Sequence, residues 1–462
     1  MTYPESVTYL TELGHELSRA KFDLKAIRRV LAGLGDPQRA YPTAIVAGTN
    51  GKGSTCAMLS EILNCARFRT GLYTSPHLVR VNERIRVAGA EIGDSDFAAA
   101  ATAVRDGTER LLETGLGVHL SFFEFLTAAA FVHFAREAVD FAVLEVGMGG
   151  RLDATNITEH RVAVITNVDL DHEQFLGHTR AAIAAEKAGV IRAGCPVISG
   201  CEDDETAGAV RRRAEELGAE WIDLPRRSRV GNICGRDGFF TFDLALDDER
   251  FADLAPSLAG EVQIRNATAA VAAAAVLRRD GMRIPVDAIQ DGLRAARWPG
   301  RLETLLDGPR LLLDGAHNPA AARELARFVA EELAGRRVRL VYASMQDKDV
   351  GEIARTLFPL AVEVFITRTR AARSAPLEEI LERAGCAAAK ALIQEDPVRA
   401  VQDACRVSAK DDVVLVAGSL FLVGAIEEAW HLGTLNLGPR QEHEDASLAA
   451  PAARSHTPRR AP

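Results

Sequence analysis

Residues 48–55, Gly-Thr-Asn-Gly-Lys-Gly-Ser-Thr, combine the residue types that hold a phosphate group. Glycines let backbone N–H groups converge on phosphate oxygens, Lys52 adds a full positive charge, and a hydroxyl can meet Mg²⁺. The pattern departs from the commonest phosphate loop, because Val46 stands six positions before Lys52 and a glycine follows the lysine. Its context supports it, since the apolar run 43–47 predicts a buried strand and a helical period begins at Cys56. The alternative is a glycine-rich turn that only joins strand to helix.

Other polar residues stand directly after apolar runs that predict strands. They are Ser75 after residues 71–73, Glu145 after 141–144, and Asp169, Asp171 and His172 after 162–168. Mg²⁺ binds through few protein carboxylates together with phosphate oxygens, so Glu145 is a candidate ligand and Ser75 could add a hydroxyl. His172 could serve a metal or a phosphate. The alternatives are a capping or salt-bridging Glu145, a Ser75 that caps a turn, and a structural His172.

The last third of the chain carries a second set of candidates. Asn318 can cap a helix that begins with proline, which is a full structural account of that residue. Asp314 and His317 have no such account and are predicted to face a crevice. Arg301 could reach phosphates, although a surface ion pair is equally compatible. Lys187, beside a glutamate on a predicted helix, is by spacing alone an ordinary surface lysine.

Strands that alternate with helices predict the elements that hold these residues. The pattern indicates an α/β protein with a doubly wound, mostly parallel sheet, whose ligands bind outside the carboxyl ends of the strands. Each polar cluster stands at such an end, so we expect one common site. A second, smaller Rossmann-like α/β pattern begins after a linker near Trp298, which divides the chain into domains 1–298 and 299–435. Residues 436–462 have no periodicity and are predicted to form a disordered tail.

Composition limits the classes of protein that the chain can represent. The 462 residues are 47% apolar and 26% charged, which is typical of a globular protein with two or three domains. A formal net charge of −9 argues against broad nucleic-acid binding. No apolar run approaches the ~20 residues that span a bilayer, and the N-terminus lacks a secretory signal, so we expect a cytoplasmic protein. The seven cysteines include no C-x-x-C pair, which favours reduced thiols over zinc.

Taken together, the motifs resemble the folylpolyglutamate synthase/dihydrofolate synthase family, a branch of the Mur ligase superfamily. The matching stretches run in family order over about residues 1–430: VAGTNGKGST, YTSPHLVRVNERI, SFFEFLT, LEVGMGGRLDATN, NVDLDHEQFLG, AAEKAGVIR, EVQIRNATAA, WPGRLE, LLLDGAHNP, QDKD and VAGSLFLVG. One departure is YASMQDKD at residues 342–349, where relatives more often have a glycine-led version.

The resemblance implies an ATP-dependent ligase with two Mg²⁺ ions. Such enzymes phosphorylate a substrate carboxylate with ATP, and the amine of L-glutamate then attacks the acyl phosphate to form an amide. The stretch RLDATN at residues 151–156 is similar to members that accept dihydropteroate. We therefore expect dihydrofolate synthase activity together with glutamate addition to reduced folates. The family default is a monomer whose partners are small molecules, with no nucleic acid and no membrane.

The resemblance also implies roles for individual residues. The nucleotide would contact Gly48, Thr49, Asn50, Gly51, Lys52, Gly53, Ser54, Thr55, Asn266, Arg301 and Asp314. The metal ligands would be Ser75 and Glu145 for one ion and His172 for the second, with Lys187 at the family position that is carbamylated. The pteroate or folate would contact Arg84, Ser121, Phe122, Phe123, Glu124, Leu152, Asp153 and Ala154. The catalytic residues would be Lys52, Lys187 and His317, the last near the acyl phosphate or the incoming glutamate.

Two other functions are compatible with parts of the sequence. A peptidoglycan-precursor ligase of the Mur type would need a uridine-nucleotide site, and only about 40 residues precede the phosphate loop to build one. A nucleotide-binding regulator without ligase turnover would explain the phosphate loop alone. The second α/β unit, with Asp314 and His317 at the end of a strand, speaks against it.

Overall fold

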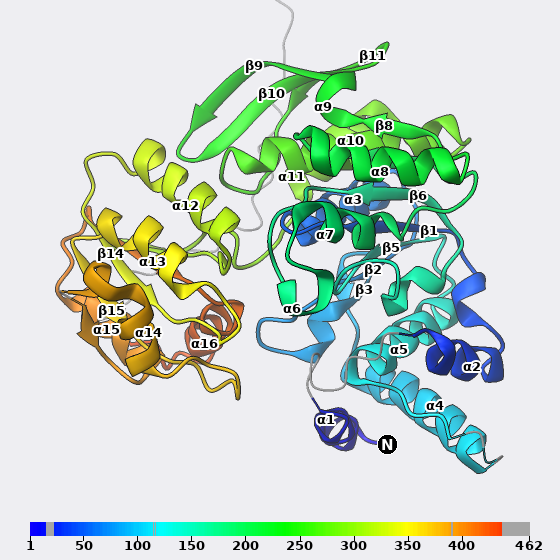
Figure 1. The fold of residues 1–462 in the computed structure, drawn as a ribbon, viewed down its shortest axis with the longest axis horizontal. Helices are drawn as coiled ribbons and strands as arrows, with labels where there is room; N and C mark the ends of the chain where they lie inside the picture. Colours follow the sequence, from blue (N-terminus) through cyan, green and yellow to red (C-terminus); the bar gives the residue numbers. More distant parts are fainter. Residues whose placement is uncertain (15–22, 114, 116, 390, 437–462) are drawn as a thin grey trace, which may run out of the picture.

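The computed structural model describes residues 1–14, 23–113, 115, 117–389 and 391–436 as two lobes around separate sheets (Figure 1). The first lobe contains an eight-stranded sheet in the order β4-β3-β2-β5-β1-β6-β7-β8, in which only the pairs β2–β3 and β3–β4 are antiparallel. Its strands are β1 Thr43–Ala47, β2 Thr70–Tyr73, β3 Ile85–Val87, β4 Ala90–Glu91, β5 Phe141–Glu145, β6 His160–Ile165, β7 Val197–Ser199 and β8 Trp221–Asp223. The central strand β1 is buried along its whole length, as expected for a parallel strand covered on both faces.

Helices cover both faces of this sheet. Alternate residues of β1 point to opposite faces, so Ala44 and Val46 pack in the cluster around α3, α10 and α11, while Ile45 and Ala47 pack against α7 and α8. The helices of the first lobe are α1 Tyr3–Glu12, α2 Lys25–Gly33, α3 Lys52–Cys65, α4 Asp94–Glu113, α5 Phe122–Arg136, α6 Glu173–Leu176, α7 Arg180–Ala188, α8 Asp204–Glu216, α9 Leu224–Arg227, α10 Val262–Arg279 and α11 Val286–Ala295. Helix α5 is apolar nearly all round, and most of its residues are buried.

A small antiparallel sheet lies above α10 (Figure 1). It consists of β9 Ser228–Arg236, β10 Phe239–Leu246 and β11 Glu249–Leu254. The hairpin between β9 and β10 turns at Asp237 and Gly238, both with positive φ, as is typical of an Asp-Gly hairpin turn. Phe242, Leu244 and Phe251 fix this sheet to the core of the first lobe.

The second lobe is a six-stranded sheet in the order β12-β13-β17-β14-β15-β16, parallel except for the edge strand β12. Its elements are β12 Glu303–Asp307, β13 Arg310–Leu313, α12 Pro319–Glu332, β14 Val338–Tyr342, α13 Val350–Leu357, β15 Glu363–Ile366, α14 Leu377–Ala384, β16 Leu392–Ile393, α15 Pro397–Arg406, β17 Val413–Ala417 and α16 Leu420–His431. The predicted fold class is confirmed. We propose that the domain boundary lies near residue 299, in the linker between α11 and β12.

No helix within the described part of the chain is long and apolar enough to cross a membrane. All seven cysteines are free thiols. The predicted tail begins at residue 436, and residues 437–462 lie outside the described residues.

Candidate active site

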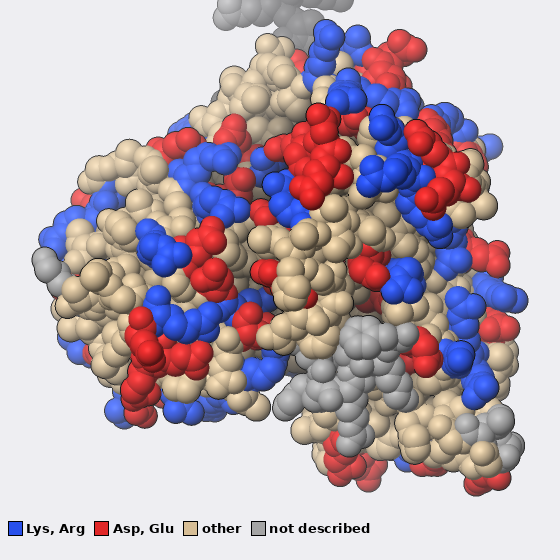
Figure 2. All heavy atoms as spheres, viewed as in Figure 1, with Lys and Arg blue, Asp and Glu red and all other residues tan. Residues whose placement is uncertain are grey.

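A cavity of about 750 Å³ lies between the two lobes, where the carboxyl ends of both parallel sheets meet. The groove between the lobes is visible in the space-filling view (Figure 2). Its wall includes most of the predicted site residues: Gly48, Thr49, Asn50, Gly51, Lys52, Gly53, Ser54, Ser75, Ser121, Phe123, Glu124, Glu145, Leu152, Asp153, Ala154, His172, Lys187, Asn266, Arg301, Asp314 and His317. Residues that are up to 269 positions apart in the chain therefore share one space, as the strand-end argument predicts.

The phosphate loop is held by the end of the neighbouring strand β6. The Thr49 N–H donates to the Asn167 carbonyl at 3.0 Å, and the Asn50 N–H donates to the Asn167 side-chain oxygen at 2.9 Å. Gly51 has a φ of +80°, and a Cβ there would collide with the Asn266 side chain, so glycine is required at this turn. Lys52 begins α3, and its ammonium donates to the carbonyls of Gly48 and Thr49 at 3.2 and 3.1 Å.

The linker between the lobes touches the same helix. A Cβ on Gly53, the second residue of α3, would lie 2.7 Å from the Trp298 indole. The indole therefore packs directly on the first turn of α3, immediately behind the phosphate loop. Any larger residue at position 53 would displace the linker.

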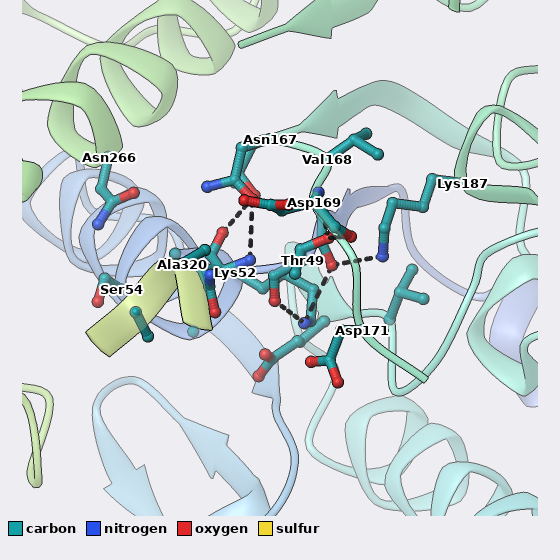
Figure 3. A pocket seen from close by; sticks show the side chains of 18 of the residues that line it. Thr49, Lys52, Ser54, Asn167, Val168, Asp169, Asp171, Lys187, Asn266 and Ala320 are labelled. Atoms are coloured by element: carbon teal, nitrogen blue, oxygen red, sulfur yellow. Dashed lines mark hydrogen bonds between the residues drawn. The ribbon is translucent and has the colours of Figure 1, made fainter. Parts of the chain in front are cut away.

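Lys187 is buried, and the interpretation as a surface lysine is wrong. Its ammonium donates to the Gly48 carbonyl at 2.8 Å, so Lys52 and Lys187 approach the same loop from two sides (Figure 3). The side chain is only 4% exposed. Burial, with the charge of Lys52 adding to it, lowers the pKa of Lys187 from 10.5 to about 7. A substantial fraction of Lys187 therefore carries the neutral, nucleophilic amine near neutral pH.

Glu145 and Ser75 lie together at the ends of β5 and β2. The Ser75 N–H donates to Glu145 Oε2 at 3.1 Å, and the carboxylate is 4% exposed. Burial raises the pKa of Glu145, while Lys52 and the Ser75 N–H oppose that shift. Carboxylate and hydroxyl oxygens suit Mg²⁺, which takes its remaining ligands from water and phosphate.

The metal prediction also depends on His172, which precedes α6 with a φ of +51°. Burial lowers the pKa of His172 to about 4, and Asp171 opposes that shift. A neutral imidazole is the form that binds a metal. Within the described ranges, no group of three His, Cys, Asp or Glu residues could by itself hold a metal ion. The donor set therefore fits ions that depend on a bound nucleotide for most of their ligands.

The second lobe contributes Asp314 and His317 from the β13–α12 loop. Asp314 accepts hydrogen bonds from the N–H groups of Leu302 and Ala316 at 3.1 and 2.9 Å. His317 Nδ1 lies 2.7 Å from the Gly315 carbonyl, which can only accept, so Nδ1 carries the proton and Nε2 keeps a lone pair. Burial, and then the charge of Lys348, lower the pKa of His317 to about 4, so the imidazole is neutral near pH 7.

Polar contacts join the lobes across the cavity. The amides of Asn50 and Asn318 exchange two hydrogen bonds, of 3.2 and 3.0 Å. Asp171 accepts from Asn318 at 3.2 Å and from the Lys348 ammonium at 2.7 Å. Burial alone would raise the pKa of Asp171, but Lys348 lowers it well below its usual range. The sequence does not single out Lys348 as a site residue, although it belongs to the QDKD stretch.

Six of the eight predicted pteroate residues line the cavity, in the part of the wall beside α5. Ser121 caps α5, and its N–H and hydroxyl both donate to Glu124 Oε2 at 2.8 Å. Glu124 Oε1 is buried and has no hydrogen-bond partner among the described residues. The Phe123 ring occupies the space that a Cβ on Gly147 would need. A buried acceptor and an aromatic ring are therefore placed together on the cavity wall.

Asp153 has a structural role that its sequence did not reveal. Its carboxylate accepts from the N–H groups of Gly147, Met148 and Thr155 at 3.0, 3.1 and 3.0 Å, and from the Thr155 hydroxyl at 2.5 Å. The carboxylate therefore orders the glycine-rich loop that follows Glu145. Burial raises the pKa of Asp153, and these hydrogen bonds oppose that shift.

Three predicted contact residues do not line the cavity. Thr55 is buried inside α3. The Arg84 Nε donates to His77 Nδ1 at 2.8 Å, and its guanidinium lies 5.4 Å from the centre of the Phe122 ring. Arg84 and Phe122 thus contact each other outside the cavity lining. Direct ligand contacts by these three residues stay a prediction.

Two family models match the chain: the Mur ligase middle domain over residues 46–274 and the Mur ligase glutamate ligase domain over 300–420. The dihydrofolate synthase/folylpolyglutamate synthase of Bacillus subtilis is 31% identical over 416 residues, which cover 89% of this chain and 96% of that protein. The chain belongs to the folylpolyglutamate synthase/dihydrofolate synthase family.

Solved structures of this family have the same fold. Escherichia coli FolC in complex with DHPP and ADP is 31% identical, with a TM-score of 0.83 over 93% of this chain and 98% of that one. A bifunctional folylpolyglutamate synthase/dihydrofolate synthase with Mn, AMPPNP and L-glutamate bound is 32% identical, with a TM-score of 0.81 over 93% and 98%. The family membership predicted from the motifs is confirmed.

Proposed function

We propose that this protein is an ATP-dependent ligase that adds L-glutamate to dihydropteroate and to reduced folates through an acyl phosphate. The observation that carries the proposal is the single cavity between the lobes. It unites the phosphate loop, Glu145 and Lys187 from the first lobe with Asp314 and His317 from the second. Family relatives with ADP, an ATP analogue, Mn and L-glutamate bound support it.

The first step transfers the γ-phosphate of ATP to the substrate carboxylate. Both reactants are anionic, so the reaction depends on neutralising charge and aligning the groups. The loop N–H groups and Lys52 would hold the phosphates, and Asn266, Arg301 and Asp314 would hold the nucleoside. Glu145, Ser75 and His172 would hold two Mg²⁺ ions, which neutralise developing charge on the phosphates.

The second step brings the amine of glutamate to the acyl phosphate. His317 is placed for this on the second lobe, because its Nε2 is a neutral acceptor near the first-lobe residues Asp171 and His172. An acceptor there can orient the attacking amine and take a hydrogen bond from it. Contact between the lobes around bound substrates would exclude water, which would otherwise hydrolyse the acyl phosphate.

Lys187 would act as a carbamate. Addition of CO₂ to a neutral amine forms an N–C bond and releases a proton, converting a potential cation into an anion. The lowered pKa of Lys187 favours the reactive neutral amine. The carbamate would replace the positive charge of Lys187, which repels Lys52 and Mg²⁺, with a negative charge that attracts both.

The folate or pteroate would lie against α5. A pterin ring is flat and carries N–H donors, and the Phe123 ring can stack on it. Glu124 Oε1, buried and without a hydrogen-bond partner in the described part of the chain, can accept from those donors. We further propose that the enzyme acts as a cytoplasmic monomer on small molecules, without nucleic-acid or membrane partners; light scattering on the purified protein tests the oligomeric state.

Phosphate release from ATP tests the function. The assay contains L-glutamate with either dihydropteroate or tetrahydrofolate, and a uridine-nucleotide peptidoglycan precursor serves as the negative control. We expect glutamate-dependent release with both pterin substrates. Phosphate release with tetrahydrofolate but not with dihydropteroate would refute the dihydrofolate synthase activity. No release with either pterin substrate would refute the proposal, and release with the uridine nucleotide would favour the Mur-type alternative.

A further inference from the structure

Asn318 uses its entire side-chain hydrogen-bonding capacity at the junction of the lobes. Its Oδ1 accepts from the Ala321 N–H at 2.9 Å and from Asn50 Nδ2 at 3.2 Å. Its Nδ2 donates to Asn50 Oδ1 at 3.0 Å and to Asp171 Oδ2 at 3.2 Å. An amide offers two acceptor and two donor positions, and all four are occupied in a side chain that is 1% exposed.

These bonds go beyond what a helix cap requires. The bond from Ala321 alone caps α12, and a serine or aspartate could provide it. The other three bonds lead to Asn50 in the phosphate loop and to Asp171 after β6. Asp171 is tied in turn to Lys348 of the second lobe, which is 8% exposed. A continuous set of partly buried polar contacts therefore connects the phosphate loop to the helix that begins beside His317.

We propose that Asn318 is a positioning residue that fixes the distance between the phosphate loop and α12, so that the amine on the second lobe meets the acyl phosphate on the first. The proposal rests on the proposed function. His317 is the immediate neighbour of Asn318, so a shift of Asn318 moves the imidazole that faces the reacting groups. Asn318 itself acts on the geometry of the two lobes and not on the reacting atoms.

The amide of Asn318 is required because each substitute loses some of the hydrogen bonds to Asn50 and Asp171. Serine keeps the cap on α12 but is too short to reach Asn50 and Asp171. Aspartate keeps the cap acceptor, yet it cannot donate and places a negative charge against Asp171. Both variants retain the helix start, so they separate the link from the stability of α12.

The decisive measurement is the ratio of phosphate released to amide formed. In a coupled ligase each amide consumes one ATP, and an acyl phosphate that meets water before glutamate releases phosphate without product. We expect N318S to slow amide formation about 10- to 100-fold, the cost of misplacing reacting groups by about 1 Å, while phosphate release falls no more than about threefold. N318D should show the same rise in the ratio. Loss of folded protein would lower both rates equally and leave the ratio unchanged.

Asp396→Ser is the matched control. Asp396 caps α15 of the same lobe through a 2.9 Å bond from the Arg399 N–H, and it does not line the cavity. This variant should keep the wild-type ratio. Hydroxylamine provides a second control, because it diffuses to the acyl phosphate without being bound by the second lobe. Hydroxamate formation by N318S should stay near the wild-type rate.

The outcomes distinguish the two proposals. A wild-type protein without phosphate release on any folate would refute the proposed function. The positioning role of Asn318 would be refuted if the wild type is active and N318S and N318D keep its ratio of phosphate to amide. A ratio that rises equally in Asp396→Ser would also refute it, since any cap on the second lobe would then have the same effect.

Discussion

Replacement of Lys187 by methionine tests directly whether a buried amine lies behind the phosphate loop. Methionine has a similar length and no charge, so K187M removes the ionisable group with little change in packing. The variant also loses the 2.8 Å bond to the Gly48 carbonyl, and the change in strength of that bond on deprotonation is already contained in the native pKa of Lys187. The pH dependence of the stability difference between wild type and K187M therefore reports on Lys187 alone.

The expected size follows from the lowered pKa. Above pH 7 and below pH 10.5 the unfolded chain holds the Lys187 proton and the native protein does not, so stability rises with pH in this window. A native pKa of about 7 against an unfolded value of 10.5 makes the lysine cost about 4 kcal/mol at pH 7 and about 2 kcal/mol at pH 9. Relative to K187M, the wild type should therefore gain about 2 kcal/mol between these two conditions.

Urea unfolding of both proteins at the two pH values provides the measurement. The buffers must be free of CO₂, because carbamate formation would consume the neutral amine. Lys410→Met, at an exposed lysine of the second lobe, is the matched control for replacing a lysine by methionine. A stability difference between wild type and K187M that is the same at both pH values would show that Lys187 keeps its proton in the native state. The reasoning from burial would then be refuted.

The other predictions concern charge and hydrogen bonds in the same cavity. Glu145→Gln should lower turnover by at least about 100-fold, because the variant binds Mg²⁺ more weakly. Its free energy of unfolding should equal or exceed that of the wild type, because burial penalises the native carboxylate. Wild-type rates at limiting Mg²⁺ would contradict the role of Glu145 in metal binding. Asp153→Asn should cost about 1–3 kcal/mol in urea unfolding, since an amide nitrogen would face the Gly147 N–H, and it should raise KM for folate more than KM for ATP; equal KM changes would oppose a loop-ordering role. His317, neutral with a pKa of about 4, should add no inflection to the kcat profile between about pH 6 and 8, so profiles of wild type and His317→Asn should differ in height and not in shape.

The long buried strands of both lobes could be predicted from the sequence because they are local features. The run 141–144 predicts β5, and the apolar residues at 413–417 predict β17, since strands covered on both faces are continuously apolar. Short edge strands could not be predicted in this way. β4 and β16 have two residues each, all exposed, so they leave no burial pattern in the sequence. β12 is only half-buried and pairs antiparallel at the edge.

The same division holds for the site. Glu145, Ser75 and Asp314 stand at predicted strand ends, so the topology of a parallel sheet suffices to bring them together. The burial of Lys187 depends on packing of α7 against the phosphate loop, which its own neighbours in the sequence do not reveal. Lys348 is paired with Asp171, 177 positions away and on the other lobe. Such a contact exists only after both lobes have folded and docked, and no local pattern records it.

The contact between Trp298 and Gly53 gives the enzyme a built-in optical probe. The chain has three tryptophans, and this one rests on the first turn behind the phosphate loop, within the peptide that connects the lobes. Indole emission depends on the polarity around the ring, so rotation of one lobe relative to the other would shift its emission wavelength. Stopped-flow recordings of the unlabelled wild type, with a Trp298→Phe subtraction, could thus time opening and closing during each turnover.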